Sequence, residues 1–252
     1  MRFNLKKVLA VAILLLLALP ILVTGKNNAA VSVPTTSKTD DGTKIERNQS
    51  KTITLEADGN IQAALDSLED DGQLILSEGV YLIDSPIQLN ARKQLLIKGQ
   101  GRVSIIGSRV DFPIFYLENC CDIIFQNLHA VHDINNVTGN EQFEKPNGSV
   151  IYLKYCENMV FNDCELEGCG VYGIYAIDTN VIDVIGCYLH HNSWRAFGIV
   201  NQKTKTILTI KSSNISQNNG FIESSENSCV VNLQGDNFIS DNTPDGYKSS
   251  RR

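Results

Sequence analysis

Apolar positions along this chain recur in short runs of strand length rather than in long helical stripes. From Gln73 onward each run spans only a few residues, and Gly, Pro, Asn or Asp separates it from the next. The stretch from Asn60 to Leu68 is different, because its apolar residues fall at 61, 64, 65 and 68. That spacing is typical of an amphipathic helix, and Asn60 can cap it. The pattern therefore predicts one short helix with an apolar face, followed by many short strands.

The strand-like runs repeat at a nearly regular interval. Four of them can be laid over one another, and their aligned last residues are Leu128, Cys164, Cys187 and Ser213. These residues are separated by steps of 36, 23 and 26 positions. One coil of a parallel β-helix takes about this many residues, and it buries its inner face only when neighbouring coils stack on it. The longer step indicates a coil with an insertion between Asp133 and Ser149.

The same alignment predicts which side chains point into the core. One inward column consists of Leu128, Cys164, Cys187 and Ser213, and a second of Ala130, Leu166, Leu189 and Ile215. Asn192, Asn218 and Asn242 recur at turn edges, where Asn suits tight bends and side-chain hydrogen bonds between rungs. An antiparallel sandwich or jelly roll also has many short strands, but neither predicts a fixed repeat with aligned small residues.

Several of these segments together resemble a known group of proteins. They are the helix before Gly79-Val80-Tyr81, the turn at 97–101 and the repeat at 173–180. From about residue 53 to 242 the chain resembles the pectin-lyase-like right-handed parallel β-helix proteins with short parallel β-helix repeats. The resemblance implies an all-β fold, a right-handed parallel β-helix (solenoid) with an N-terminal capping α-helix. It implies little about function, because this fold hosts lyases, hydrolases, epimerases, tailspikes and adhesins.

The two ends of the chain differ from its middle. Basic residues at 2, 6 and 7 precede the unbroken apolar run Val8–Val23, and small or polar residues follow it, which is the layout of a signal peptide. We expect this peptide to cover residues 1–25; an uncleaved anchor is the alternative, although 16 residues are few for a membrane span. A polar linker (26–52), the β-helix (53–242) and a polar tail (243–252) follow. This organisation predicts a secreted, periplasmic or cell-surface protein.

Composition narrows the partners and cofactors. The hydrophobic content of 42% is sufficient for a core, and a net charge of −6 argues against a nucleic-acid partner. The seven cysteines are an odd number, so disulfides would leave at least one thiol over. Cys164 and Cys187 share a column, and Cys120 and Cys156 are 36 positions apart, which equals one step of the repeat. Stacked positions of this kind favour cysteines that are small core residues over cysteines that form disulfides. No cysteine pair has a repeated zinc-type spacing, so we predict neither a metal nor a cofactor.

The resemblance implies that a substrate would lie along the outer face of one sheet, beside the turn that precedes it. A polygalacturonase of this fold has paired aspartates at the strand entry, whereas the matching positions here read 169–172, Cys-Gly-Val-Tyr, and 192–195, Asn-Ser-Trp-Arg. Inverting hydrolysis by two carboxylates therefore lacks its acid and its base. The carboxylate cluster that a calcium-dependent pectate lyase needs cannot be assembled either.

One edge of the predicted solenoid still concentrates reactive side chains. His132 precedes the insertion and His191 occupies the equivalent turn two rungs later, about 9.6 Å away, which is too far for one metal ion. Adjacent His190 and His191 are expected to point to opposite sides, with at least one at the surface. Trp194 is the only Trp, and an indole beside Arg195 suits a pyranose ring and a uronate carboxylate.

Two functions fit this edge. The first is binding of an acidic polysaccharide or cell-surface glycan through His132, Tyr172, Trp194 and Arg195. The second is a polysaccharide lyase acting on uronate-containing glycans, in which Lys145 or His191 removes the proton and Arg195 neutralises the developing enolate. The missing acid motifs favour binding without catalysis.

The C-terminal end of the solenoid lacks a second capping helix in the sequence. After Phe238-Ile239 the chain runs into a turn and a short basic tail. A last rung with unpaired backbone groups is a template for pairing. We expect either the tail or a second subunit to cover it, so self-association is a further prediction.

Overall fold

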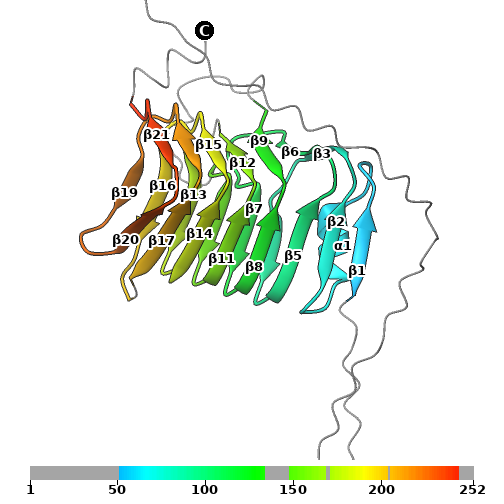
Figure 1. The fold of residues 1–252 in the computed structure, drawn as a ribbon. Coiled ribbons are helices and arrows are strands. Elements are labelled where there is room, and N and C mark those ends of the chain that lie inside the picture. The colour runs from blue at the N-terminus through cyan, green and yellow to red at the C-terminus, as the bar shows by residue number, and fades with distance from the viewer. Residues whose placement is uncertain (1–50, 134–147, 169–170, 204, 244–252) are drawn as a thin grey trace, which may run out of the picture. The chain divides into compact units, whose positions relative to one another are not determined.

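The computed structural model describes residues 51–133, 148–168, 171–203 and 205–243. These residues belong to one compact unit and form an all-β parallel solenoid of about seven turns (Figure 1). The predicted signal peptide and most of the linker, the centre of the insertion and most of the tail lie outside them. Within the four described ranges, no helix has both the length and the apolar character needed to cross a membrane.

Three parallel sheets, here called A, B and C, run along the solenoid (Figure 1). The strands of sheet A, in spatial order, are β1 (Thr52–Leu55), β2 (Gln73–Leu76), β5 (Lys93–Gly99), β8 (Cys121–Gln126), β11 (Glu157–Asn162), β14 (Val181–Ile185), β17 (Thr206–Lys211) and β20 (Cys229–Gln234). Those of sheet B are β3 (Gly79–Ile83), β6 (Val103–Gly107), β9 (His129–His132), β12 (Glu165–Glu167), β15 (Tyr188–His190), β18 (Asn214–Ser216) and β21 (Phe238–Ser240). Those of sheet C are β4 (Ile87–Asn90), β7 (Phe115–Glu118), β10 (Ile151–Lys154), β13 (Tyr172–Ile177), β16 (Arg195–Val200) and β19 (Ile222–Ser224).

The pairing register confirms the repeat that the sequence predicts. Ile123 pairs with Met159, Met159 with Ile182, and Ile182 with Leu208, which reproduces the steps of 36, 23 and 26. In sheet B, Leu166 pairs with both Ala130 and Leu189, so the second predicted column is continuous. Because each coil pairs in register with the next, side chains of one column lie directly above one another.

The inner faces of the three sheets enclose a continuous core. Both predicted columns are buried, and no member is more than 4% exposed. Phe125 and Phe161 stack with ring centroids 5.2 Å apart, one strand spacing. The six described cysteines are free thiols, and the Cys187 Sγ accepts a hydrogen bond from the Cys164 backbone at 3.4 Å. Four of these thiols, Cys120, Cys156, Cys164 and Cys187, are buried and fill the narrow core as small side chains, whereas Cys121 and Cys229 are partly exposed. Cys169 lies outside the described residues.

One short helix, α1 (Ile61–Asp66), lies between β1 and β2. Asn60 caps it, since its side chain accepts a hydrogen bond from the Ala63 amide at 2.9 Å. At the other end the guanidinium of Arg92 donates to the carbonyls of Leu65 and Leu68, which satisfies backbone oxygens that a helix end leaves open. Leu65 is 1% exposed and belongs to the common core. The apolar stripe of the sequence thus becomes the buried face of α1.

An asparagine ladder stabilises the corner between sheets B and C. The side-chain amide of Asn192 donates to Oδ1 of Asn218 at 2.7 Å, and the amide of Asn218 donates to Oδ1 of Asn242 at 2.8 Å. Each of these oxygens also accepts from the backbone amide of the preceding Asn. The predicted hydrogen bonding between rungs is confirmed.

The last rung exposes side chains that would be internal in any other coil. Val231 and Leu233 of β20 pair with Leu208 and Ile210, both fully buried, yet they are 37% and 57% exposed themselves. Ile239 of β21, which pairs with the fully buried Ile215, is also only partly buried. The described residues therefore leave the C-terminal end of the core open.

Candidate functional site

The residues predicted for the site lie on both sides of one corner of the solenoid. We call this the B–C corner; in the best described coil it is the segment 191–194, which joins β15 to β16. His190 and His191 lie on the sheet B side, and Arg195 begins β16 on the sheet C side. Asn192 and Ser193 between them are buried, so the two groups face different outer surfaces. The sequence predicted one edge with a single group of reactive side chains, whereas the structure has two neighbouring groups, one on each side of the corner.

The two adjacent histidines do not point to opposite sides as predicted. His191 has a left-handed backbone (φ 55°), which ends the strand alternation at that residue. As a result the Nδ1 atoms of His190 and His191 lie 2.6 Å apart. His190 is buried, and its ring stacks on Tyr188 with a centroid distance of 3.8 Å.

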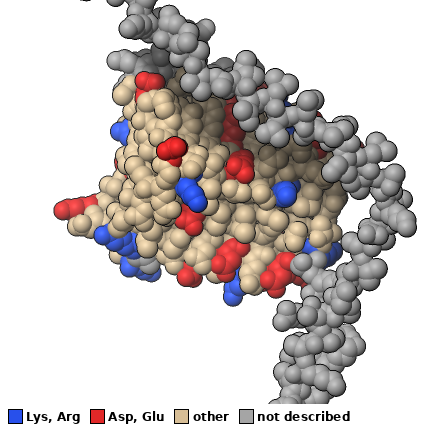
Figure 2. Space-filling model, in the orientation of Figure 1, with Lys and Arg blue, Asp and Glu red and all other residues tan. Residues whose placement is uncertain are grey.

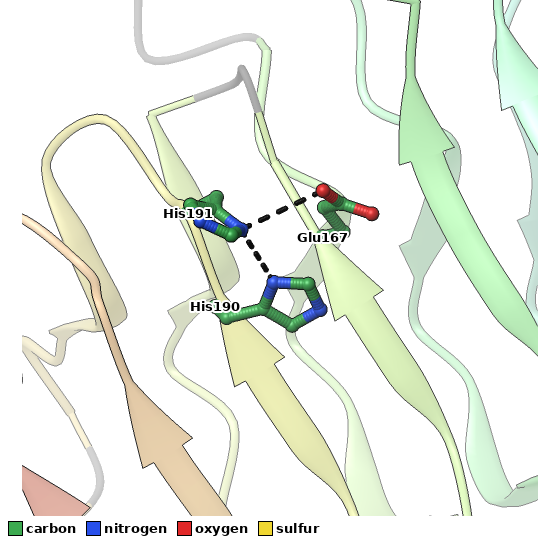
Figure 3. A group of neighbouring side chains, drawn as sticks. All are labelled: Glu167, His190 and His191. Atoms are coloured by element: carbon green, nitrogen blue, oxygen red, sulfur yellow. Dashed lines mark hydrogen bonds and ion pairs between the residues drawn. The ribbon is translucent and has the colours of Figure 1, made fainter. Parts of the chain in front are cut away.

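Two glutamates of β12 complete a polar cluster with these histidines, and Figure 3 shows one of them, Glu167, beside His190 and His191. Oε1 of Glu165 lies 3.0 Å from Nε2 of His190, and Oε1 of Glu167 lies 3.6 Å from Nδ1 of His191. The other oxygen of Glu167 lies 3.2 Å from Nε2 of His129, whose Nδ1 is 3.2 Å from the Ser104 hydroxyl. We call His129, Glu165, Glu167, His190 and His191 the His–Glu cluster. It gathers three of the four histidines of the chain.

Hydrogen bonds keep both carboxylates of the His–Glu cluster ionised. The bonds of Glu167 with His129, and then with His191, hold the pKa of its carboxyl group well below the usual range. The bond with His190 is the main cause of the lowered pKa of Glu165. Burial opposes both shifts, so the histidine contacts outweigh it. The cluster therefore presents anionic oxygens next to imidazole nitrogens, a set of groups that can exchange protons or bind a cation.

His132 is not placed to contact a substrate, which corrects the sequence prediction. The register of β9, β12 and β15 confirms that it is equivalent to His191, since Val131, Glu167 and His190 are paired. However, its side chain turns inward, is 1% exposed and lies 2.9 Å from the Phe112 carbonyl through Nε2. Burial lowers its pKa to about 4, so it is a neutral core residue at neutral pH. His132 and His191 thus occupy equivalent backbone positions, but the side chain of His132 points into the core whereas that of His191 lies in the His–Glu cluster on the outer face.

On the sheet C side, Trp194 and Arg195 form a partly exposed pair. The Arg195 guanidinium lies 4.7 Å from the centroid of the Trp194 ring, within cation–π range, and 37% of Trp194 is exposed. The Arg195 Nη1 donates to the carbonyls of Trp194 and Asn219. The indole of Trp194 and the hydroxyl of Tyr172 both donate to Oε2 of Glu223. These bonds fix the orientation of both side chains at the corner.

Tyrosines extend this pair into a strip on the outer face of sheet C. We call Tyr116, Tyr152, Tyr175, Tyr172 and Trp194 the aromatic strip. Neighbouring tyrosine rings lie 4.9 to 5.3 Å apart, and the partly exposed Tyr116, Tyr152 and Tyr175 stand on successive paired strands. Gly198 leaves the space they need, because a Cβ there would lie 2.6 Å from the Tyr175 ring. Tyr172 is 8% exposed, and burial, then its bond to Glu223, raises its pKa.

The three catalytic candidates are not brought together by the described residues. Lys145 lies outside them, in the insertion that leaves the same corner after Asp133. His191 belongs to the His–Glu cluster, whereas Arg195 belongs to the aromatic strip side. Sequence reasoning missed His129, Glu165 and Glu167, although the repeat places Glu165 in register with His129 and could have indicated the group.

Figure 2 shows the face over sheet A in the orientation of Figure 1. Lys and Arg are scattered there among Asp, Glu and many uncharged residues, with no continuous region of one sign. A polyanion such as a nucleic acid would need a basic stripe. This face offers none.

Comparison with known proteins supports the fold. No protein-family model and no curated protein matches the sequence. Among solved structures, a Parabacteroides merdae protein with a provisional assignment as a glycosyl hydrolase matches at 17% identity and a TM-score of 0.57, over 78% of this chain and 97% of its own. The PL6 family alginate lyase AlyGC matches at 16% identity and a TM-score of 0.52, over 80% of this chain and 31% of its own.

A third match is the ORF18 protein of Geobacillus virus E2, at 18% identity and a TM-score of 0.53. It covers 70% of this chain and 37% of its own, so this chain spans only about a third of the length of the viral protein and of the alginate lyase. Identities this low establish the fold alone. The chain has the parallel β-helix fold of pectin-lyase-like structures.

Proposed function

We propose that this chain is an exported protein that binds an acidic polysaccharide along the outer face of sheet C. The observation that carries the proposal is the aromatic strip, which ends at the B–C corner beside Arg195. Aromatic rings suit sugars, because their faces and edges supply apolar contact to the faces of pyranose rings. The strip runs across three strands, β7, β10 and β13, and ends at Trp194 just before β16, long enough for several sugar units.

Arg195 supports an acidic rather than a neutral ligand. Within the described part of the chain, the hydrogen bonds of the Arg195 guanidinium are donated by Nη1. Nη2 and Nε therefore remain to bind a carboxylate. An arginine stacked on an aromatic ring binds carboxylates well, because the planar group is already held in place. The apolar run Val8–Val23 fits this proposal, since an exported protein meets extracellular or envelope glycans.

Arg195→Ala is expected to weaken binding of an oligouronate by about 1.5 to 3 kcal/mol, the range for a hydrogen bond to a charged group. Isothermal titration of the full-length protein measures this change, and a neutral oligosaccharide of equal length serves as the second ligand. Trp194→Ala should weaken binding of both ligands while lowering the melting temperature only slightly, because its ring is partly exposed. Assays for unsaturated product on the same samples would identify lyase activity.

Arg109→Ala is the matched control, since Arg109 is an exposed arginine paired with Asp111 on the β6–β7 connection. It should bind as the parent does. A stable Arg195→Ala protein with unchanged affinity would move the site elsewhere. A Trp194→Ala protein that unfolds would instead make that residue part of the core.

We further propose that the open C-terminal rung mediates self-association. Val231 and Leu233 form its exposed apolar surface, and edge strands with free backbone groups pair readily. Leu233→Asp should shift the protein from dimer to monomer in sedimentation experiments, because it places a charge in the contact. A parent protein that is monomeric at every concentration would contradict this proposal.

A further inference from the structure

We propose that Glu167, His190 and His191 bind one divalent transition-metal ion on the outer face of sheet B, with Zn²⁺ as the first candidate. None of these residues belongs to the aromatic strip, so the proposal does not depend on glycan binding. Two imidazoles and one carboxylate are a ligand set that proteins use for zinc and other first-row metals.

The three proposed ligand atoms already lie close together. Nδ1 of His190 and Nδ1 of His191 are 2.6 Å apart, Oε1 of Glu167 is 3.6 Å from the latter, and all three atoms lie within 4.8 Å of one another (Figure 3). Ligands at the usual zinc distances of about 2.0–2.2 Å would be separated by roughly 3.4 Å in a tetrahedral site. Small side-chain rotations therefore suffice to admit the ion.

His190 is held in the tautomer that coordination through Nδ1 requires. Its Nε2 faces the Glu165 carboxylate at 3.0 Å and donates its proton there, which leaves the Nδ1 lone pair directed at His191. A histidine that binds metal through one nitrogen and donates the other N–H to a carboxylate is the usual arrangement in zinc sites. Glu165 is thus a positioning residue for the ligand.

Glu167 is oriented in the same way. Its Oε2 is 3.2 Å from Nε2 of His129, and His129 is fixed in turn by the Ser104 hydroxyl. The remaining oxygen, Oε1, is the one that faces His191. Two of the three proposed ligands therefore have a second hydrogen-bonded partner that sets their direction.

The site is accessible from solvent on one side. The side chains of Glu167 and His191 are 32% and 19% exposed, whereas that of His190 is 6% exposed. An ion can enter past the first two and rest against the third. Three protein ligands leave at least one coordination position for water or a ligand.

A rival assignment uses His129, Glu165 and Glu167, whose ligand atoms also lie within 4.8 Å of one another. Both assignments need Glu167. They differ in the other two ligands, which are His129 and Glu165 in the rival set and His190 and His191 in the proposed set. Carboxylate-rich sets with one histidine favour harder cations, so this alternative makes a different prediction for zinc.

Titration of the metal-free full-length protein with Zn²⁺ tests the proposal, and Co²⁺ absorption reports the ligand type. We expect one equivalent of zinc to bind, with a cobalt spectrum free of thiolate charge transfer. Glu167→Gln and His191→Asn should each weaken zinc binding by at least about 100-fold, and Glu165→Gln by about 10- to 100-fold, as positioning residues do. Asn is chosen at 191 because it tolerates a left-handed backbone.

Glu118→Gln is the control, since Glu118 pairs with Lys154 on sheet C and should leave zinc affinity unchanged. Thermal melts of each metal-free variant separate lost binding from lost folding. A parent that binds no zinc, or a folded His191→Asn protein that binds it as tightly as the parent, would overturn the proposal. Loss of binding in His129→Gln but not in His191→Asn would overturn it in favour of the rival set.

Discussion

Asn218→Ala is expected to destabilise the solenoid by about 2 to 4 kcal/mol. The Asn218 side chain is fully buried and connects three coils through the asparagine ladder. Its amide also donates to the carbonyls of Leu189 and Ser216. Truncation leaves the Asn192 backbone amide and these carbonyls without this partner in a buried corner, and each stranded group costs about 1–3 kcal/mol. Urea unfolding measures the change.

Asn90→Ala is the matched control, because Asn90 is exposed at the end of β4. Its unfolding free energy should stay within about 0.5 kcal/mol of the parent, as for most surface substitutions. If Asn218→Ala unfolds at the same urea concentration as Asn90→Ala, the ladder is not a source of stability. The B–C corner would then be held by sheet pairing alone.

The fold could be predicted because each coil repeats the same short pattern of residues. Each coil pairs with its neighbour in register, so a residue such as Cys187 has the same environment as Cys164 one rung away. Small residues in one column and Asn at one corner then recur at the coil period. These signals need no knowledge of distant contacts.

The site could be predicted only in part, because it depends on side-chain directions within that frame. The alignment placed His132 and His191 at equivalent positions, but His191 adopts a left-handed backbone and His132 turns into the core. Trp194 and Arg195 were found because their types are distinctive. Glu165 and Glu167 look like ordinary surface residues until β12 is placed between β9 and β15.

Leu65→Asp is expected to lower the unfolding free energy by at least about 3 kcal/mol. Leu65 lies on the buried face of α1 and is 1% exposed in the common core. Removing a buried Leu side chain already costs about 2–5 kcal/mol, and a carboxylate without a partner adds its desolvation. The substitution therefore tests whether α1 caps the first coil or is merely attached to it. Thermal and urea unfolding of the full-length protein measure the change.

Leu82→Asp is the same substitution at a solvent-exposed position, since Leu82 of β3 is 76% exposed. It should cost no more than about 1 kcal/mol, the span of strand propensities. A large loss for Leu65→Asp and a small one for Leu82→Asp would mean that the helix seals the core against water. Equal melting temperatures for the two variants would contradict the capping role. In that case the carboxylate at position 65 would have to reach solvent, which requires α1 to detach while the coil beneath it stays folded.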